Sequence, residues 1–129
     1  MNELSSEDKS LVEEARAIIR KRFKEGVHHI GSALRTKSGQ VFVGVHLEGY
    51  IGRVAVCGEA IAIGHAATAG DTDIDTIVAV TEEGRVVPPC GICRELISDY
   101  SPEAKIIVEE ENELKAVLVS DLLPQKYRR

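Results

Sequence analysis

Two short segments, Cys57-Gly58-Glu59 and Pro89-Cys90-Gly91-Ile92-Cys93, contain every cysteine of this chain of 129 residues. Three thiolates can hold a zinc ion and leave its fourth tetrahedral position open to water, as in catalytic rather than structural zinc sites. Glu59 follows the first cysteine by two positions, so its carboxylate can move the protons of that water. We therefore predict one Zn²⁺ per chain, with Cys57, Cys90 and Cys93 as ligands and Glu59 as the catalytic proton carrier.

Two other interpretations of the cysteines are a closed structural zinc site and a redox Cys-x-x-Cys pair. The first needs a fourth protein ligand, and the second would not need Cys57 or Glu59. Cys90 and Cys93 are one helical turn apart, so their sulfur atoms face the same side of a helix. We expect both cysteine segments to begin helices, because the dipole and the free backbone N–H groups at a helix start favour thiolates.

The composition is that of one globular domain over residues 1–129. Hydrophobic residues make up 43% and charged residues 29% of a chain long enough to bury a core. The sequence has no run of 18 apolar residues, and an N-terminus with Glu3, Glu7 and Asp8 is unlike a signal peptide. We expect a cytoplasmic protein with no membrane partner, because unpaired cysteines with metal-ligand spacing indicate a reducing compartment.

The charge balance argues against nucleic acid as a partner. The net charge is −5, and no basic cluster is interleaved with aromatic residues. Binding to a phosphate backbone needs a positive surface. We therefore expect a small-molecule substrate.

Hydrophobic periodicity predicts the element order α-β-β-α-β-α-β-β. This order fits an α/β fold, a three-layer α/β/α sandwich with a mixed five-stranded sheet. Residues 60–70 carry no formal charge, so this helix should be buried against the sheet or at a subunit interface. The expected helices are residues 5–26, 60–70 and a segment between Pro89 and Pro102, and the expected strands are residues 30–36, 41–46, 77–80, 106–108 and 116–119, followed by a helical turn at 121–123.

Cys-x-Glu followed by Pro-Cys-x-x-Cys is the signature of zinc-dependent nucleobase and nucleoside deaminases. With a cysteine as the first ligand, the chain resembles the small homotetrameric cytidine deaminases, a family that includes blasticidin S deaminase-like members. The resemblance covers roughly residues 10 to 128, through residues 30–34, 43–48, 90–94 and 122–124 together with Tyr127.

The resemblance implies hydrolytic deamination of cytidine or deoxycytidine to uridine or deoxyuridine, with release of ammonia, by a homotetramer. An alternative substrate is blasticidin S or another modified aminopyrimidine or purine nucleoside. A catalytically silent zinc-binding domain is an alternative of another class.

The resemblance also assigns roles at the substrate site. It implies that the Gly58 N–H holds the base carbonyl and that the Pro88 carbonyl accepts a hydrogen bond from the leaving amine. Glu48 matches a carboxylate that binds a ribose hydroxyl; the alternative is a plain exposed glutamate. Arg94 would offset part of the thiolate charge.

Three further positions have two interpretations each. His46 replaces an asparagine that binds the sugar, and it either contacts substrate or ends a strand. His28 stands where the family has a phenylalanine that packs against the base; it either stacks on the base in the same way or is a loop histidine without that role. Tyr127 aligns with an aromatic residue that closes a neighbouring subunit's site, or it packs on the surface. The loop 49–56 matches the family pattern poorly, so the substrate is less determined than the chemistry.

Overall fold

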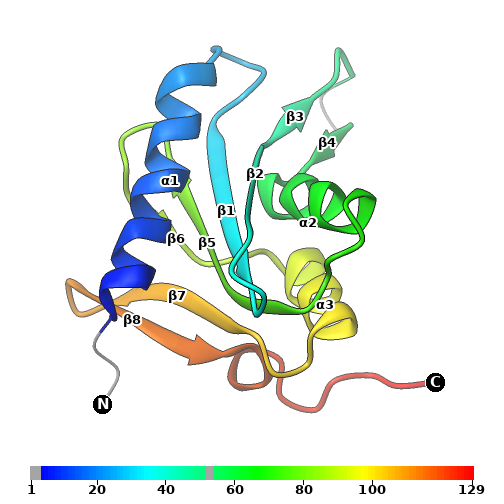
Figure 1. The fold of residues 1–129 in the computed structure, drawn as a ribbon. Helices are drawn as coiled ribbons and strands as arrows, with labels where there is room; N and C mark the ends of the chain where they lie inside the picture. The colour runs from blue at the N-terminus through cyan, green and yellow to red at the C-terminus, as the bar shows by residue number, and fades with distance from the viewer. Residues whose placement is uncertain (1–3, 52–53) are drawn as a thin grey trace.

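The computed structural model describes residues 4–51 and 54–129 (Figure 1). Glu3, and Gly52 and Arg53 of the poorly matching loop, lie outside the described residues. The helices are α1 (Ser6–Arg22), α2 (Gly58–Thr68), α3 (Gly91–Tyr100) and the 3-10 turn η1 (Val119–Leu122). The strands are β1 (Ile30–Thr36), β2 (Val41–Val45), β3 (Leu47–Glu48), β4 (Ala55–Val56), β5 (Ile74–Thr81), β6 (Val86–Val87), β7 (Lys105–Glu110) and β8 (Glu113–Leu118).

The main sheet is mixed, with the strand order β2-β1-β5-β7-β8. β1 runs antiparallel to both β2 and β5, β5 and β7 are parallel, and β8 returns antiparallel to β7. The five predicted strands are all present. The prediction of five strands misses β6, which pairs with β5 and makes the sheet six-stranded. A strand of two residues is too short to show the alternation by which strands are predicted.

Helices cover both faces of this sheet, which confirms the three-layer sandwich (Figure 1). Neighbouring strand residues point to opposite faces, so Ala33 packs with the α1 side and Leu34 with the α2 and α3 side. On the first face, α1 contributes Leu11, Val12, Ala15 and Ile19; on the second, α2 and α3 contribute Ala62, Ile63, Ala66 and Ile97. β5 is buried along residues 76–80, because helices lie over both of its faces.

α1 begins as predicted, with the Ser5 side chain accepting a hydrogen bond from the Asp8 N–H. The predicted end at Gly26 is wrong, because the helix ends at Arg22. Gly26 instead has a φ of +77° in the turn that follows. Glycine adopts this left-handed conformation without steric cost. The chain reverses there and enters β1 through His28 and His29.

α2 approaches β2 closely enough to require glycine at position 44. A Cβ on Gly44 would lie 2.5 Å from Ala62 N and 2.8 Å from Gly58 O. This contact sets the first turn of α2 against the sheet. The helix begins two residues earlier than predicted and is buried on one side only, since Gly64, Ala67 and Thr68 are exposed in the single chain.

Within the described ranges, no helix is both long and apolar enough to cross a membrane.

Candidate metal centre and active site

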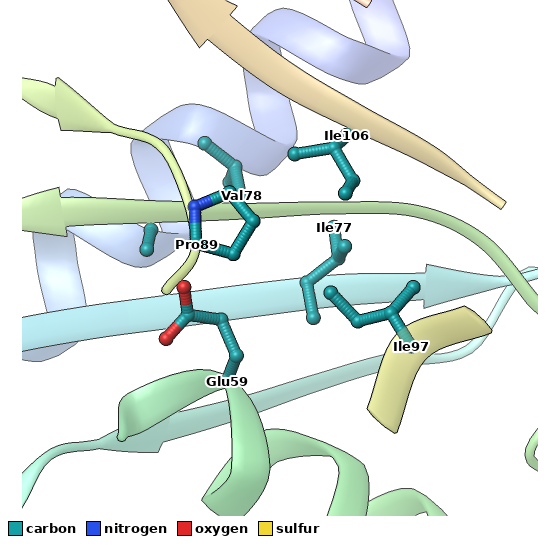
Figure 2. Close-up of a pocket in the computed structure, with 7 residues that line it drawn as sticks. Glu59, Ile77, Val78, Pro89, Ile97 and Ile106 are labelled. Atoms are coloured by element: carbon teal, nitrogen blue, oxygen red, sulfur yellow. The ribbon is translucent and has the colours of Figure 1, made fainter. Parts of the chain in front are cut away.

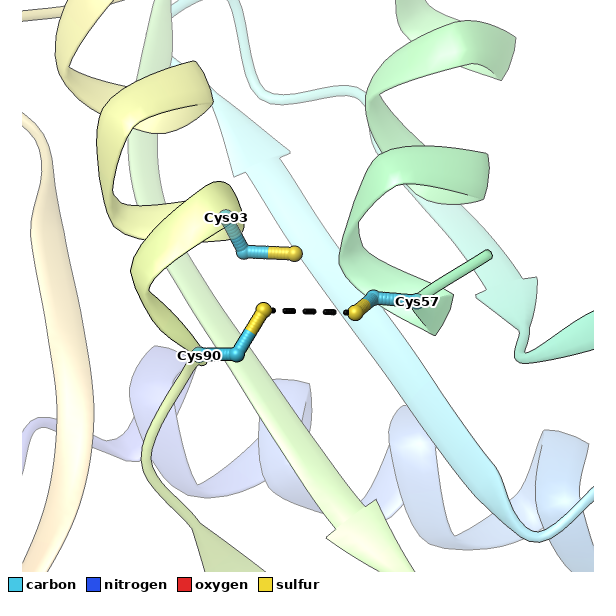
Figure 3. A group of neighbouring side chains, drawn as sticks. All are labelled: Cys57, Cys90 and Cys93. Atoms are coloured by element: carbon cyan, nitrogen blue, oxygen red, sulfur yellow. Dashed lines mark hydrogen bonds between the residues drawn. The ribbon is translucent and has the colours of Figure 1, made fainter. Parts of the chain in front are cut away.

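The three cysteines meet where two helices begin (Figure 3). Cys57 is the N-cap of α2, Cys90 is the N-cap of α3, and Cys93 lies in the first turn of α3. The sulfur atoms lie within 4.8 Å of one another, and Cys57 Sγ is 3.4 Å from Cys90 Sγ. The structure thus brings together the residues that sequence spacing singled out. Their sulfur atoms form a cluster that can hold a metal ion.

The three thiols differ in how readily they ionise. Burial raises the pKa of Cys57, and the hydrogen bond with Cys90 raises it further. Burial also raises the pKa of Cys93, as does the nearby Glu59 carboxylate. Burial works in the same direction at Cys90, but hydrogen bonds from the Cys93 N–H and the Cys57 thiol, and then from the Cys93 thiol and the Ile92 N–H, outweigh it and lower the pKa of that thiol. Three thiolates this close repel one another. The donor set therefore fits a cation that takes thiolate ligands, as zinc does.

Glu59 lies in the first turn of α2 and is 6% exposed. Figure 2 shows its carboxylate pointing toward Pro89, in an apolar surrounding that includes Ile77 and Val78. Cys93 Sγ donates to Glu59 Oε1 at 3.9 Å. Burial raises the pKa of Glu59 against the opposing effects of its own backbone N–H and the Cys93 thiol. A carboxyl group with a raised pKa can take up and release a proton at a pH closer to neutrality.

An open cavity of about 210 Å³ borders the cysteine cluster. A mostly apolar lining with a few polar groups is typical of a small-molecule site. Six residues predicted as ligands, catalyst or substrate contacts line it: His46, Cys57, Gly58, Glu59, Pro88 and Cys90. The cavity also has apolar lining residues that sequence reasoning missed: Ile30, Ala55, Val56 and Val87.

Among the missed residues, Ala55 and Val56 form β4, which pairs with β3 as a small separate hairpin. Their only sequence signal was a short apolar run directly before Cys57. Such a run is too brief to distinguish a strand from a loop.

Other predicted site residues lie outside the lining of this cavity. His28 borders a second hollow of about 300 Å³, between α1 and α2 at the edge of β2. The Glu48 carboxylate accepts a hydrogen bond from His46 Nε2. Tyr127 is 80% exposed in the C-terminal segment.

Arg94 lies one residue after Cys93, and its guanidinium contacts two backbone carbonyl groups. Arg94 Nε donates to Pro89 O at 2.9 Å, and Nη1 donates to Leu122 O at 3.1 Å. These bonds fasten the loop that carries Cys90 to the C-terminal segment. This is a different task from the predicted compensation of thiolate charge, which stays a prediction.

Comparisons with known proteins agree with this geometry. A family model described as the cytidine and deoxycytidylate deaminase zinc-binding region matches residues 5–109. The chain belongs to this deaminase family. Blasticidin-S deaminase of Bacillus cereus is 46% identical over 134 residues, covering 98% of this chain and 96% of that protein. Cytidine deaminase of Halalkalibacterium halodurans is 32% identical over 97 residues, 74% of each protein.

Solved structures of cytidine deaminases share the fold of this family member. The Burkholderia pseudomallei enzyme has a TM-score of 0.78 and 27% identity, covering 92% of this chain and 98% of the other. The Mycobacterium leprae enzyme has a TM-score of 0.77 and 25% identity, covering 91% of this chain and 97% of the other. The predicted family, fold, zinc cofactor and nucleoside deaminase class are confirmed. The protein is a zinc-dependent hydrolytic deaminase.

Proposed function

We propose that this enzyme hydrolyses the exocyclic amine of an aminopyrimidine nucleoside. The bond from ring carbon to amine nitrogen breaks, the oxygen of water becomes the new carbonyl oxygen, and ammonia leaves. The observation that carries this proposal is the buried Glu59 carboxylate beside three clustered cysteines, at the wall of a cavity of about 210 Å³. A general acid and base, a metal centre and space for a ring are therefore in one place.

Blasticidin S is the substrate that we place first and cytidine the second. The support is the higher identity with blasticidin-S deaminase, 46% over nearly the whole chain, against 32% over 74% of the chain for a cytidine deaminase. The sequence motifs alone favoured the opposite order. The poorly matching loop 49–56 lies next to the cavity through Ala55 and Val56, so its departure from the cytidine deaminase pattern supports a different substrate.

In the proposed mechanism, Cys57, Cys90 and Cys93 would hold the zinc ion. When bound, zinc is a Lewis acid that makes water a nucleophile near neutral pH. Glu59 accepts a proton from the attacking water on its carboxylate. It passes that proton to the ring nitrogen next to the reacting carbon. It then takes a second proton from the added hydroxyl group, whose oxygen becomes the carbonyl oxygen, and delivers it to the departing amine. The raised pKa of Glu59 favours such shuttling, because the carboxyl must both gain and lose a proton in each cycle.

Backbone groups orient the base in this proposal. Gly58 opens α2, where N–H groups have no acceptor within the helix. Its N–H can therefore hold the carbonyl oxygen of the base. Pro88 precedes the Cys90 loop and lines the same cavity, and its carbonyl can accept a hydrogen bond from the amine. Glu48 would accept one from a hydroxyl or amine of the sugar-like part.

The test is ammonia release from blasticidin S, cytidine, deoxycytidine and aminated purine nucleosides. Wild type should release ammonia from at least one aminopyrimidine nucleoside. Glu59→Gln should keep its zinc but lose at least about 10³-fold in turnover, because one residue serves several proton transfers. Glu83→Gln is the control, since Glu83 is exposed in the turn after β5. A Glu59→Gln enzyme with a tenth of wild-type activity would show that another base acts.

We further propose a homotetramer whose sites are completed by neighbouring subunits. Supporting observations are the exposed apolar residues near the β3–β4 hairpin, Tyr50, Ile51 and Val54, and the exposed uncharged face of α2. Self-association would cover both surfaces. Tyr127, in the exposed C-terminal segment, would reach a neighbouring site. Light scattering should give about four times the chain mass of 14.0 kDa, and Tyr50→Asp should lower it. An active monomer would contradict the proposal.

We infer a cytoplasmic location from the cysteines. The three cysteines are free thiols, and metal-binding thiols persist where glutathione keeps them reduced. Fractionation of cells that express the tagged protein should recover it with the cytosol; recovery outside the cell would contradict this inference.

A further inference from the structure

His46 lies between β2 and β3, and both of its ring nitrogens have hydrogen-bond partners. Its Nδ1 is 2.8 Å from the His29 backbone nitrogen, and its Nε2 is 2.8 Å from Glu48 Oε1. The His46 side chain is 12% exposed and borders the cavity next to the cysteines. It thus stands at the substrate site, with its hydrogen-bonding capacity already in use.

The His29 contact fixes where the proton of His46 lies. A backbone N–H can only donate, so Nδ1 of His46 must be the bare acceptor nitrogen. The ring proton is therefore on Nε2, and Nε2 donates to the Glu48 carboxylate. His28 completes the network, because its Nδ1 donates to the His46 carbonyl oxygen at 2.8 Å.

The His29 backbone is itself held in place. The Gly26 N–H donates to His29 Nε2 at 2.8 Å, and the His29 ring packs edge-on against Phe23 with 5.3 Å between ring centroids. The His29 N–H that determines the tautomer of His46 therefore belongs to a loop that is itself held by a hydrogen bond and an aromatic contact. A chain of contacts runs from the end of α1 through His29 and His46 to Glu48.

Glu48 ends this chain beside the cavity, which it does not itself line. It lies in β3 opposite Ala55 of β4, and Ala55 lines the cavity. The Glu48 side chain is 35% exposed. A carboxylate can accept about four hydrogen bonds, so the bond from His46 leaves it acceptor capacity for a ligand.

We propose, resting on the proposed function, that His46 is a positioning residue: it holds the Glu48 carboxylate toward the substrate and makes no hydrogen bond to the substrate itself. The part of the nucleoside that reaches Glu48 must then donate hydrogen bonds, through hydroxyl or amine groups. Because His46 gives Glu48 a hydrogen bond but no positive charge, Glu48 stays a net anion and disfavours a phosphate at that place.

The activity test compares the zinc-loaded His46→Asn, His46→Gln, Glu48→Gln and double His46→Asn/Glu48→Gln enzymes on the best nucleoside substrate. Asparagine can replace Nδ1 but does not reach Glu48, whereas glutamine places a donor near the position of Nε2. His46→Asn should raise KM about tenfold or more, the effect of losing a hydrogen bond to a charged group, with kcat changed less than about threefold. His46→Gln should recover part of this loss.

The double variant decides whether His46 acts through Glu48. If it does, the double variant has the KM of Glu48→Gln alone, because the bond can be lost only once. Effects that multiply in the double variant would overturn the proposal, since His46 would then contact substrate by itself. Leu47→Val is the control for a general disturbance of this segment, because Leu47 lies between His46 and Glu48 and its side chain is exposed. The KM of this variant should stay at the wild-type value.

A second readout does not depend on turnover. Nitrogen-15 NMR of the ring should show His46 Nδ1 without a proton and Nε2 with one. A proton on Nδ1 would overturn the proposal even if every kinetic result agreed. If wild type deaminates no nucleoside, the proposed function fails, while the NMR result still decides how His46 and Glu48 are paired.

Discussion

Cys57 Sγ and Cys90 Sγ lie 3.4 Å apart, although 33 positions separate the two residues in the chain. Each is the N-cap of a different helix, α2 or α3, and neither side chain accepts a hydrogen bond from the backbone N–H groups of its own helix start. A metal ion held by both would therefore join two helix starts whose side chains are otherwise linked by the thiol hydrogen bonds of Cys57 with Cys90 and of Cys93 with Glu59. Metal occupancy and the stability of this face of the sheet should be coupled.

The first prediction is that wild type holds one zinc per chain and that Cys93→Ser holds less than a tenth of that. Cys93 is fully buried in the cluster, so serine there leaves a hydroxyl that is a poor ligand for zinc. Metal analysis and thermal unfolding measure the effect. Ile92→Ser is the matched control, because Ile92 is 77% exposed on the same turn. Equal zinc contents in the two variants would refute the ligand set.

A second prediction concerns the contact of Gly44 with α2. Gly44→Ala should destabilise the fold by at least about 1 kcal/mol, the scale of overpacking in a tight interior, and should weaken zinc binding. The reason is that the new Cβ would push on Gly58 O, in the turn that carries Glu59. Urea unfolding and competition with a chelator measure the two effects.

Gly31→Ala provides the comparison for this prediction. A Cβ there would lie 2.7 Å from Ala15 O, on the face of the sheet that α1 covers. Gly31→Ala should lower the free energy of unfolding by a similar amount, while its zinc affinity should stay close to that of wild type. Equal losses of zinc affinity in both variants would mean that Gly44 has no special relation to the metal centre.

Arg94 gives a third prediction, because its guanidinium bonds two carbonyl oxygens at once. Arg94→Lys keeps the positive charge but loses the planar fork. We expect it to cost about 1 kcal/mol and to speed hydrogen exchange around Leu122, with zinc content unchanged. Arg20→Lys, on the exposed side of α1, is the control. If Arg94→Lys keeps full stability, charge alone is what Arg94 supplies.

The fourth prediction is a pH dependence from Asp75. Burial alone would raise the pKa of Asp75, but hydrogen bonds from Arg35 at 2.7 Å and Thr76 at 2.8 Å outweigh it and lower the pKa below the ordinary value of 3.8. The stabilisation is therefore present above pH 3.8 and is lost as the pH falls through the lower pKa of the folded state.

Asp75→Asn tests this dependence. The Asp75 side chain is 30% exposed, so solvent screens the pair and the cost at pH 7 should be only about 0.5–1 kcal/mol. The difference in the free energy of unfolding between wild type and Asp75→Asn, measured by urea unfolding, should be smaller at pH 3 than at pH 7. Asp73→Asn is the control, because that carboxylate is 68% exposed. If this difference in unfolding free energy did not change with pH, the pKa of Asp75 would be the same in the folded and unfolded states, which would contradict the prediction.

The sequence predicted those features that a single local rule determines. Zinc chemistry restricts ligands to few residue types at short spacing, so Cys57, Cys90 and Cys93 could be identified without a structure. β1 was predicted over residues 30–36, because a turn-forming segment follows it directly. The prediction that residues 1–129 form one domain stays a prediction.

The remaining features depend on contacts between distant segments. β3, β4 and β6 have two residues each, and pairing partners rather than periodicity determine such strands. The partners of His46 include a backbone N–H 17 positions away, which no motif shows. The sequence therefore left open whether His46 touches substrate. His28 was expected near the base by alignment with an aromatic residue, yet its ring nitrogen is used in the network behind His46.

β5 has two successive partners along one edge: β7 pairs at Thr76 and Ile77, and β6 pairs at Ala79 and Val80. β6 therefore covers backbone groups that would otherwise form an open edge on the most buried strand of the sheet. The same segment continues to Cys90, so a metal ion bound there would fix the chain just after β6. Open apolar edges are templates for intermolecular pairing. Cells starved of zinc should consequently accumulate this protein in inclusion bodies, and zinc supply should set the yield of recombinant expression.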